Sequence, residues 1–495
     1  MSALIVIGAA TVIALFTGIL ARKGRTMNLE EWAVGGRSFG SIFVFILLAG
    51  EIYTTFTFIG GSGWAYGKGA PVYYVLVYPT LGYVLSYWLM PPIWRYAKQH
   101  QLVSQSHFFS HKYDSPLLGV LAALVGVLAM VPFLMLQLKG LGIIVAAASY
   151  GAVSPTLAIW IGAAVVALYV IISGVRGSTW NAVFKDFLIL FIVVFLGIYL
   201  PVHYHGSIGG MFRAIDAAKP NFLVFPETGM NIAWFQSTVL LTVLGFHMWP
   251  NTFGAAFTAK DDNVFRRNAV ALPLYQLILL FALFSGFAVI LVIPGLTGGE
   301  IDLALLKLSL QTFDPWFIGV IGAAGVLTAL VPGSMLMLSV ATVLANDVFR
   351  GAISKQVSDG AVINLARLFV PLIAIVAVLL AISGGDTIVA LLLMGYSFVV
   401  QLFPSLISSL LPNNRITKQG AIAGIVVGLS VVVFTSVTKT SMADLLPFLP
   451  PSMQGVNIGF FALTTNVLTM LLVSGVTQSL RSSADPGGST NRQAA

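Results

Sequence analysis

The chain has 495 residues, of which 58% are hydrophobic and only 8% are charged, and its mean hydropathy is +0.95. A soluble domain carries roughly 25% charged residues because its surface must be hydrated, so most of the outside of this protein has to meet lipid. This composition excludes soluble enzymes, nucleic-acid-binding proteins and disordered proteins. The net charge of +8 does not indicate a nucleic-acid partner, because the basic residues stand in short loops between apolar runs. The chain has no cysteine, which excludes disulfides and thiolate metal sites.

Apolar runs long enough to cross a membrane follow one another along almost the whole chain. A transmembrane helix needs about 20 apolar residues to cross a hydrocarbon layer of about 30 Å. The sequence predicts thirteen such spans, at about 4–21, 39–66, 69–98, 116–147, 154–174, 182–203, 233–258, 268–295, 316–347, 363–383, 386–411, 419–437 and 457–476. We expect the first to be retained rather than cleaved as a secretory signal, because basic residues follow it and none precedes it.

The basic residues predict the orientation of these spans. If residues 22–38 face the cytoplasm, the inner loops hold 19 of the 25 Lys and Arg residues, Lys185 among them, and the outer loops hold five. Such an asymmetry is typical of a multi-pass protein of the cytoplasmic (inner) membrane. We therefore expect the N-terminus outside and the C-terminus inside. The lipid bilayer is the expected surrounding, and the sequence does not indicate an oligomeric state.

The second span contains an ionisable residue near its centre. In the run LLAGEIYTTFTFIGG, Glu51 follows Ala49 and Gly50 and precedes hydroxyl-rich residues. A carboxylate at the middle of a bilayer costs roughly 2.5–3.5 kcal/mol, so it needs a partner or a role. Glycine and β-branched residues weaken the local helix, and a break would free backbone carbonyls to bind a cation. A role in coupling or substrate binding and a protonated glutamic acid that bonds to a neighbouring helix both remain open.

The seventh span is predicted to be interrupted as well. In GFHMWPNT, Gly245 and Pro250 flank His247, and Pro250 lacks an amide donor and clashes with the preceding turn. Trp249 and Asn251 add hydrogen-bonding groups. We expect a discontinuous helix that lines a site, although a buried histidine with a purely structural role is an alternative.

Two further spans carry unusual residues. Gln137 and Lys139 of the fourth span are two positions apart, so on a helix they point about 200° away from each other. We expect Gln137 to line a cavity and the long Lys139 side chain to reach the outer membrane surface. Pro332 and Gly333 predict a kink in the ninth span.

The interrupted spans fall in a regular pattern. Spans two and seven each open a group of five helices, and because five is an odd number the second group must run in the opposite sense. Paired interrupted helices in an inverted repeat predict a secondary-transporter site at the middle of the membrane. The predicted organisation is therefore an all-α integral membrane protein with an extra N-terminal helix (1–21), two five-helix repeats (39–203 and 233–411), two extra C-terminal helices (419–476) and a disordered tail (477–495).

Several segments resemble signatures of the sodium:solute symporter family. They are AVGGRSFG before the second span, GVRGSTWNAVFKDFLIL after the fifth and MGYSFVVQLFPSLI in the eleventh. Within the family the sequence is most similar to bacterial permeases for monocarboxylates such as lactate, pyruvate and acetate, through GEIYT at 50–54, MVPFLMLQLKG at 130–140, WPNT at 249–252 and ALVP at 329–332. The resemblance implies a LeuT-type five-plus-five core.

The resemblance also places the family's sodium site and reveals a departure from it. The site maps to backbone carbonyls of Ala49 and Ile52 and to Thr328, Val331 and Pro332. Val331 and Pro332 have no side-chain oxygen, where the family has two hydroxyl ligands. A hard cation needs several oxygen ligands, so we expect a weakened sodium site.

Glu51 stands where proline-transporting members of the family carry an aspartate. We therefore expect it to take part in coupling, with H⁺ or Na⁺ as the coupling ion and no other cofactor. Asp186 matches an acid that the family keeps near the ion exit path. Alternatively, it is a helix N-terminal acid that interacts with the helix dipole and with Lys185.

The expected function is cation-coupled uptake of a small organic solute, which we expect to be a short monocarboxylic acid. The candidate substrate-binding residues are those near the two breaks that offer hydrogen-bonding groups: Tyr53, Thr54, Gln137, His247, Trp249 and Asn251. The alternative is a sodium-coupled symporter for proline, pantothenate or another organic acid. A membrane sensor with a transporter fold is a remote alternative, because the C-terminal tail is too short for an output module. An enzyme is not expected, since no HExxH, GxSxG or paired-acid motif falls inside a span.

Overall fold

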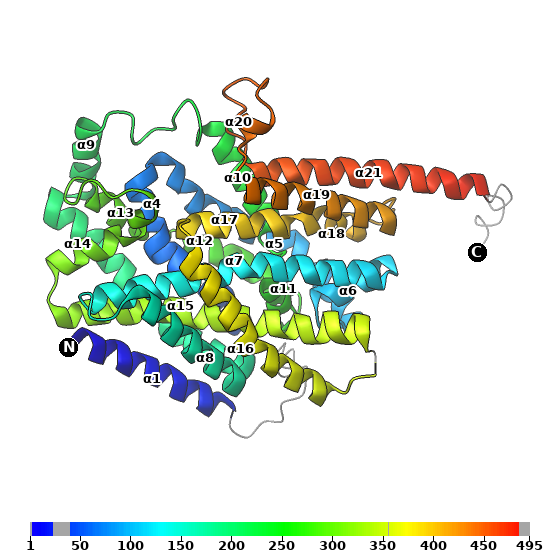
Figure 1. Cartoon of the computed structure of the whole chain (residues 1–495), viewed down its shortest axis with the longest axis horizontal. Helices are drawn as coiled ribbons and strands as arrows, with labels where there is room; N and C mark the ends of the chain where they lie inside the picture. Colours follow the sequence, from blue (N-terminus) through cyan, green and yellow to red (C-terminus); the bar gives the residue numbers. More distant parts are fainter. Residues whose placement is uncertain (1, 23–39, 355, 485–495) are drawn as a thin grey trace.

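The computed structural model describes residues 2–22, 40–354 and 356–484. Within these ranges every regular element is a helix (Figure 1). Each of the thirteen predicted spans coincides with one or more helices. The motif AVGGRSFG, except for its last glycine, lies outside the described residues.

The first half of the chain contains the first interrupted span. Its elements are α1 (Ser2–Arg22), α3 (Ser41–Gly50), the π-helix η2 (Phe56–Gly60), α4 (Gly61–Lys68), the 3-10 helix η3 (Ala70–Tyr73), α5 (Tyr74–Gln99), α6 (Gln105–Tyr113), α7 (Pro116–Ala148) and α8 (Pro155–His205).

Helix α8 covers the fifth and sixth predicted spans. The Asn181 side-chain amide donates a hydrogen bond to the Tyr169 hydroxyl at 2.8 Å. Twelve residues of straight helix would separate the two Cα atoms by about 18 Å, which no tyrosine and asparagine side chains can bridge. The helix must therefore bend between Tyr169 and Asn181, so α8 does not pass through the fifth and sixth predicted spans as one straight rod.

The second half contains the second interrupted span and the C-terminal helices. Its elements are α9 (Ile208–Ala218), α10 (Ile232–Gly245), α11 (Pro250–Phe257), α12 (Asn263–Gln276), α13 (Leu279–Val289), the 3-10 helix η4 (Gly298–Leu303), α14 (Ala304–Thr312), α15 (Pro315–Thr342), the π-helix η5 (Val343–Ile353), α16 (Asp359–Ser383), α17 (Ile388–Val399), η6 (Val400–Leu402), α18 (Phe403–Leu410), α19 (Lys418–Thr438), α20 (Met442–Leu445) and α21 (Ile458–Ala484).

Helix starts are set by local sequence signals. The side chains of Ser115, Ser154 and Thr387 cap α7, α8 and α17 by accepting a hydrogen bond from a backbone N–H of the first turn. Proline follows the cap of α7 and of α8, where its missing N–H costs nothing. At these three helices, residues of the preceding loop therefore set where the helix begins.

Eight helical segments of the described residues are long and apolar enough to cross a membrane, and four shorter apolar segments accompany them. Helices α7 and α15 lie in the interior, and α15 is almost entirely buried. Helix α1 packs against α8 and α15, whereas α19 and α21 form a pair of their own (Figure 1). Large apolar side chains such as Phe187 and Leu472 remain exposed on the outer helices, which fits a surface that meets lipid.

Three details differ from the sequence predictions. The eighth predicted span is divided, because α12 ends at Gln276 and α13 begins at Leu279, with i→i−3 hydrogen bonds from Leu277 and Ile278 in between. Helix α15 continues through Pro332 without interruption, and the irregular segment is the π-helix η5 that follows it. Helix α21 continues to Ala484, so residues 477–484 of the predicted disordered tail are helical; the rest of the tail lies outside the described residues.

Candidate functional site: a chamber between two broken helices

The second span is broken at Glu51. Helix α3 ends at Gly50, and helical structure resumes only after four residues of turn and bend. The break is stabilised from within its own segment, because the Thr57 hydroxyl donates to the carbonyls of Ile52 and Thr54, both at 3.0 Å. The amide of Ile52 in turn donates to the carbonyl of Ala49 at 3.1 Å. Short-range bonds of this kind replace the regular helical ladder.

The seventh span is broken at His247. Helix α10 ends at Gly245 and α11 begins at Pro250, with four residues of turn and bend between them. Proline at the start of α11 has no N–H to donate to the last turn of α10. The carbonyl of Met248, freed by the break, accepts a hydrogen bond from the Gln105 amide at 2.8 Å. Both interruptions that the sequence predicts are thus present.

A direct hydrogen bond joins the two breaks. The Asn251 Nδ2 donates to Oε2 of Glu51 at 2.6 Å. Glu51 is partly accessible and Asn251 is buried. The first residues of the second half-helix therefore hold the only carboxyl group of the first break.

A chamber of about 430 Å³, counted with its open mouth, lies beside this bond. Glu51, Thr54 and Trp249, which the sequence singles out, contribute to its wall. Most of the remaining wall is aromatic, with edge or tilted ring contacts at centroid distances of 4.8–6.4 Å. The aromatic residues are Phe56, Tyr78, Tyr83, Phe133, Phe246 and Tyr396. The wall of this chamber is therefore mostly apolar and offers few polar partners.

The other candidate substrate residues lie around the chamber rather than in its wall. The Gln137 Oε1 accepts hydrogen bonds from the Thr55 hydroxyl at 2.8 Å and from its backbone N–H at 3.4 Å, so Gln137 supports the first break from α7. The Tyr53 hydroxyl donates to the carbonyl of Tyr275 at 3.3 Å. The His247 Nε2 lies 3.1 Å from the carbonyl of Gly82 and is directed at α5.

The aromatic wall is the part of the site that sequence reasoning missed. Tyr78 and Tyr83 stand in an ordinary apolar helix, and nothing in their spacing separates them from packing residues. Tyr396 offered a signal, because it belongs to the segment MGYSFVVQLFPSLI that resembles the family pattern. Only the packing of α5 and α17 against both breaks brings these rings together.

The residues mapped to the sodium site are engaged in bonds within their own helices. The carbonyl of Ile52 accepts from Thr54 N and from the Thr57 hydroxyl, and the Thr328 hydroxyl donates to the carbonyl of Gly325 at 2.6 Å. Val331 and Pro332 are buried in α15 and contribute no side-chain oxygen.

Lys185, grouped above with the basic residues of the inner loops, is fully buried, which corrects that placement. It lies in the second half of α8, and its ammonium contacts the first break. The neighbouring Asp186 is also buried and lies within 3.0 Å of the ammonium.

A second hollow leads from the breaks towards the end of the molecule formed by α6 and η5, which we call the inner end. It measures about 700 Å³ with its open mouth, and its wall includes Asn251, Ser339, Gln105, Ser104 and Asp347. Because Asn251 belongs to this wall and also bonds to Glu51, the hollow reaches the polar centre of the chamber.

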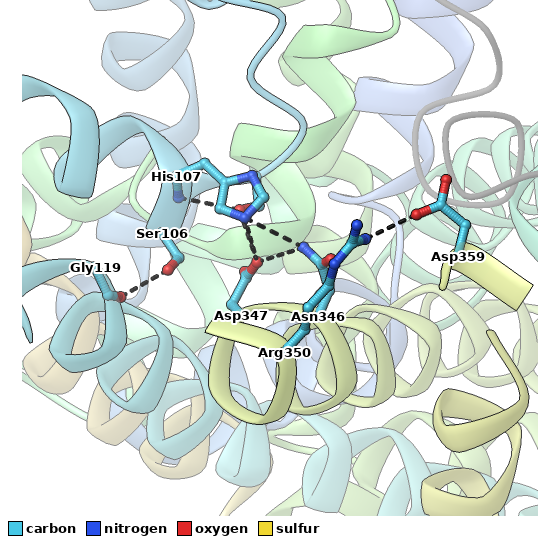
Figure 2. A network of polar contacts seen from close by, with 8 residues as sticks. Ser106, His107, Gly119, Asn346, Asp347, Arg350 and Asp359 are labelled. Atoms are coloured by element: carbon cyan, nitrogen blue, oxygen red, sulfur yellow. Dashed lines mark hydrogen bonds and ion pairs between the residues drawn. The ribbon is translucent and has the colours of Figure 1, made fainter. Parts of the chain in front are cut away.

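A network of polar side chains joins α6 and η5 (Figure 2). The Ser104 hydroxyl donates to Asp347 Oδ1 at 2.9 Å, and the Asn346 amide donates to the same oxygen at 2.7 Å. The His107 Nε2 lies 3.5 Å from that oxygen. These contacts join α6 to η5 at the inner end.

The opposite end, which we call the outer end, is closed by packing. Lys139 reaches it, as the sequence predicts, and its ammonium lies 3.6 Å from Asp302 of η4 and donates to the carbonyl of Asp386. The Asp302 carboxylate also accepts from the backbone N–H of Ile388 at 3.1 Å. Trp64, Tyr74 and Trp234 pack with centroid distances of 5.6–5.9 Å between α4, α5 and α10.

Comparison with known proteins identifies the class of molecule to which this chamber belongs. A sequence model described as the sodium:solute symporter family matches residues 32–428. The chain is 55% identical over 483 residues to a Bacillus subtilis (strain 168) protein named uncharacterized symporter YhjB, covering 98% of this chain and 99% of that protein. It is 29% identical over 418 residues, with 82% of each chain covered, to the monocarboxylate transport permease protein of Rhizobium johnstonii.

The fold agrees with this assignment. A solved Na⁺-coupled sialic acid symporter in a substrate-bound outward-open state superposes with a TM-score of 0.77 at 16% identity, covering 96% of this chain and 98% of that one. The predicted LeuT-type core is therefore confirmed, and the relatives and the fold neighbour are transporters rather than enzymes. The chain is a multi-pass membrane protein that belongs to the sodium:solute symporter family, whose activity is cation-coupled solute symport.

Proposed function

We propose that the protein takes up a short monocarboxylate together with a proton, through the carboxyl group of Glu51. The hydrogen bond between Glu51 and Asn251 across the two breaks carries this proposal, because it places one ionisable group beside the chamber and also beside the inner hollow. The similarity to the Rhizobium johnstonii permease supports the substrate class.

The electrostatics of the chamber favour a proton as the coupling ion. An anionic substrate beside an ionised Glu51 would be repelled by it in a medium of low dielectric constant. A proton on Glu51 removes this repulsion, and the joint movement of one proton and one monocarboxylate anion transfers no net charge. Among the described side chains, Lys185 on α8 and Tyr83 on α5 interact electrostatically with Glu51, and Asp186 lies 3.0 Å from the Lys185 ammonium.

The alternative is a sodium-coupled symporter for proline, pantothenate or another organic acid. One observation favours an amino acid such as proline: an ionised carboxylate within an aromatic wall also suits a substrate ammonium group. The two proposals therefore differ in the charge that Glu51 carries when substrate binds.

Counterflow in proteoliposomes identifies the substrate class. Labelled short monocarboxylates, proline, pantothenate and a sugar are compared at fixed pH, and the proposal expects exchange of the monocarboxylates. Uptake is then measured with an imposed pH gradient, acidic outside, in choline buffer. Accumulation without Na⁺ supports proton coupling, whereas uptake that appears only on addition of Na⁺ contradicts it.

Replacement of Glu51 by glutamine separates coupling from binding. The amide keeps the size of the side chain and can hydrogen-bond with Asn251, but it cannot bind and release a proton. We expect Glu51→Gln to lose at least 90% of pH-gradient-driven accumulation, a change of about tenfold or 1.4 kcal/mol, while substrate exchange is retained. The matched control is Glu227→Gln, an exposed glutamate in the loop between α9 and α10. Full gradient-driven accumulation by Glu51→Gln would contradict the proposed role.

We also propose that the inner end faces the cytoplasm, with the N-terminus outside and the C-terminus inside. The excess of basic residues in the loops at this end supports the orientation. The inner hollow would then be the path by which solute leaves the chamber for the cytoplasm.

A further inference from the structure

Lys185 is a fully buried lysine in the interior of the helix bundle. Its Nζ donates to the carbonyl of Gly50 at 2.5 Å and to the carbonyl of Tyr53 at 3.1 Å, and it lies 3.0 Å from Oδ1 of Asp186. A buried ammonium is costly unless it is paired and hydrogen-bonded. Three oxygen partners around one ammonium therefore indicate a built site.

The two carbonyls belong to the break in the second span. Gly50 is the last residue of α3, and Tyr53 lies within the turn that follows it. Ala49 and Ile52 immediately precede these two residues. Their carbonyls accept hydrogen bonds from amides or hydroxyls of the same segment. The ammonium thus binds carbonyl oxygens that the break leaves without a helical partner, which are the groups that a cation would use.

We propose that the ammonium of Lys185 is a resident cation that replaces sodium at the first break. This inference rests on the proposed function only in taking the break as the place where the coupling cation acts. A sodium ion at the same carbonyls would lie within a few ångströms of the ammonium, and two like charges at that distance repel strongly in a medium of low dielectric constant. The residues of the site therefore do not fit sodium while Lys185 is present.

The opposite side of the predicted sodium site supports the same conclusion independently. On α15 the side chains of Val331 and Pro332 offer no oxygen, so of the three mapped residues only Thr328 has a side-chain oxygen for a cation. A hard cation needs several oxygen ligands, and the described side chains of this part of α15 do not supply them. If the Lys185 ammonium has replaced a bound sodium ion, two changes are expected: the loss of oxygen ligands on α15 and the presence of the ammonium at the carbonyls of the break.

Removal of the ammonium should reveal a sodium site. With alanine at position 185, the carbonyl oxygens of Gly50 and Tyr53 and the carboxylate of Asp186 would surround a space that a sodium ion and water can fill. An uncompensated Asp186 in that space would attract a cation. The altered protein should then bind Na⁺, which the wild type excludes.

The experiment measures thermal unfolding of the purified full-length protein in detergent, with Na⁺ itself as the probe. NaCl is titrated against choline chloride and KCl at constant ionic strength. We expect no Na⁺-specific change in the unfolding midpoint of the wild type. For Lys185→Ala we expect a saturable, Na⁺-specific rise of about 2 °C or more, as binding to the folded state requires.

Two further variants make the result interpretable. Lys185→Thr places a hydroxyl in the same space and should show the same Na⁺-specific rise, so it serves if the alanine variant does not fold. Lys68→Ala removes an exposed lysine at the end of α4, outside the proposed cation site, and should remain insensitive to Na⁺. A saturable Na⁺-specific rise in the wild type overturns the proposal, and so does a folded Lys185 variant without one.

This measurement does not depend on the transported solute. If counterflow shows that the substrate is not a monocarboxylate, the Na⁺ titration of the wild type and of Lys185→Ala still decides the role of Lys185. Conversely, sodium binding by the wild type would overturn the inference about Lys185 without identifying or excluding any substrate.

Discussion

At the scale of single residues, the site depends on a small number of polar groups in an apolar bundle. Glu51, Asn251 and Lys185 are held by specific partners, because a polar group without a partner is costly at this depth. Asn251 joins the two half-helices through its bond to Glu51. Its position predicts an effect on transport that exceeds its effect on folding.

Replacement of Asn251 by leucine should slow transport by about 10- to 100-fold. A hydrogen bond to a charged group contributes about 1.5–3 kcal/mol, and leucine has a similar size but no donor for Glu51. Counterflow of the solute identified by the panel measures the rate, and thermal unfolding in detergent checks the fold. The matched control is Asn268→Leu, a buried asparagine on α12 whose amide donates to the carbonyl of Ser41 at 3.4 Å. Equal rates for the two variants would show that the bond between the breaks is dispensable.

At the scale of elements, two helices are divided, and the short 3-10 helix η4 joins other elements at the outer end. Element η4 carries Asp302 into contact with α7 and with the start of α17, through Lys139 and Ile388. This cluster joins the first repeat to the second near the outer end. Its stability should depend on pH because Asp302 is fully buried.

Burial raises the pKa of Asp302 from 3.8 to about 6, while the Lys139 ammonium and the Ile388 N–H lower it in part. The folded protein therefore holds this proton more tightly than the unfolded chain. The resulting stabilisation is fully present below pH about 4 and is lost as the pH rises through about 6. Relative to Asp302→Asn, whose amide does not titrate, the wild type should lose roughly 1–3 kcal/mol between pH 4 and 7.

Thermal unfolding midpoints across this pH range measure the effect of Asp302→Asn. The difference between wild type and variant should change between pH 4 and 6 and be constant above pH 7. Asp314→Asn, at the start of α15, is the control for an acid at the same end of the molecule. A constant difference between wild type and Asp302→Asn at all pH values would show that the carboxyl does not titrate in this range.

At the scale of the whole molecule, the two ends differ. The inner hollow extends from Asn251 towards Asp347, whereas aromatic rings and the Asp302 cluster close the outer end. The described arrangement therefore opens to the inner end. Because the chain contains no cysteine, single cysteines can be introduced without any background.

Cysteine labelling tests this asymmetry. Ser339 lines the inner hollow, whereas Ser62 of α4 is fully buried near the outer end. We expect a membrane-impermeant maleimide to label Ser339→Cys at least about ten times faster than Ser62→Cys in inside-out vesicles, since only accessible thiols react. Intact cells, where the reagent meets the outer side, should show little labelling of either. Faster labelling of Ser62→Cys from outside would contradict the described state.

The membrane class, the helical character, both breaks and the family are all predictable from local sequence. These features are local: apolar length, the residues Gly50, Glu51 and Pro250, and short motifs are all visible along the chain, and each acts through the backbone next to it.

Only the tertiary structure decided which groups meet at the breaks. The sequence groups Lys185 with the basic residues of the inner loops because it stands near the inner end of a span. In the structure its ammonium instead donates hydrogen bonds to the carbonyls of Gly50 and Tyr53. The aromatic wall comes from helices far apart in sequence, so no local pattern marks Tyr78 or Tyr83. Contacts between distant helices depend on how the helices pack, and a single sequence does not specify that packing directly.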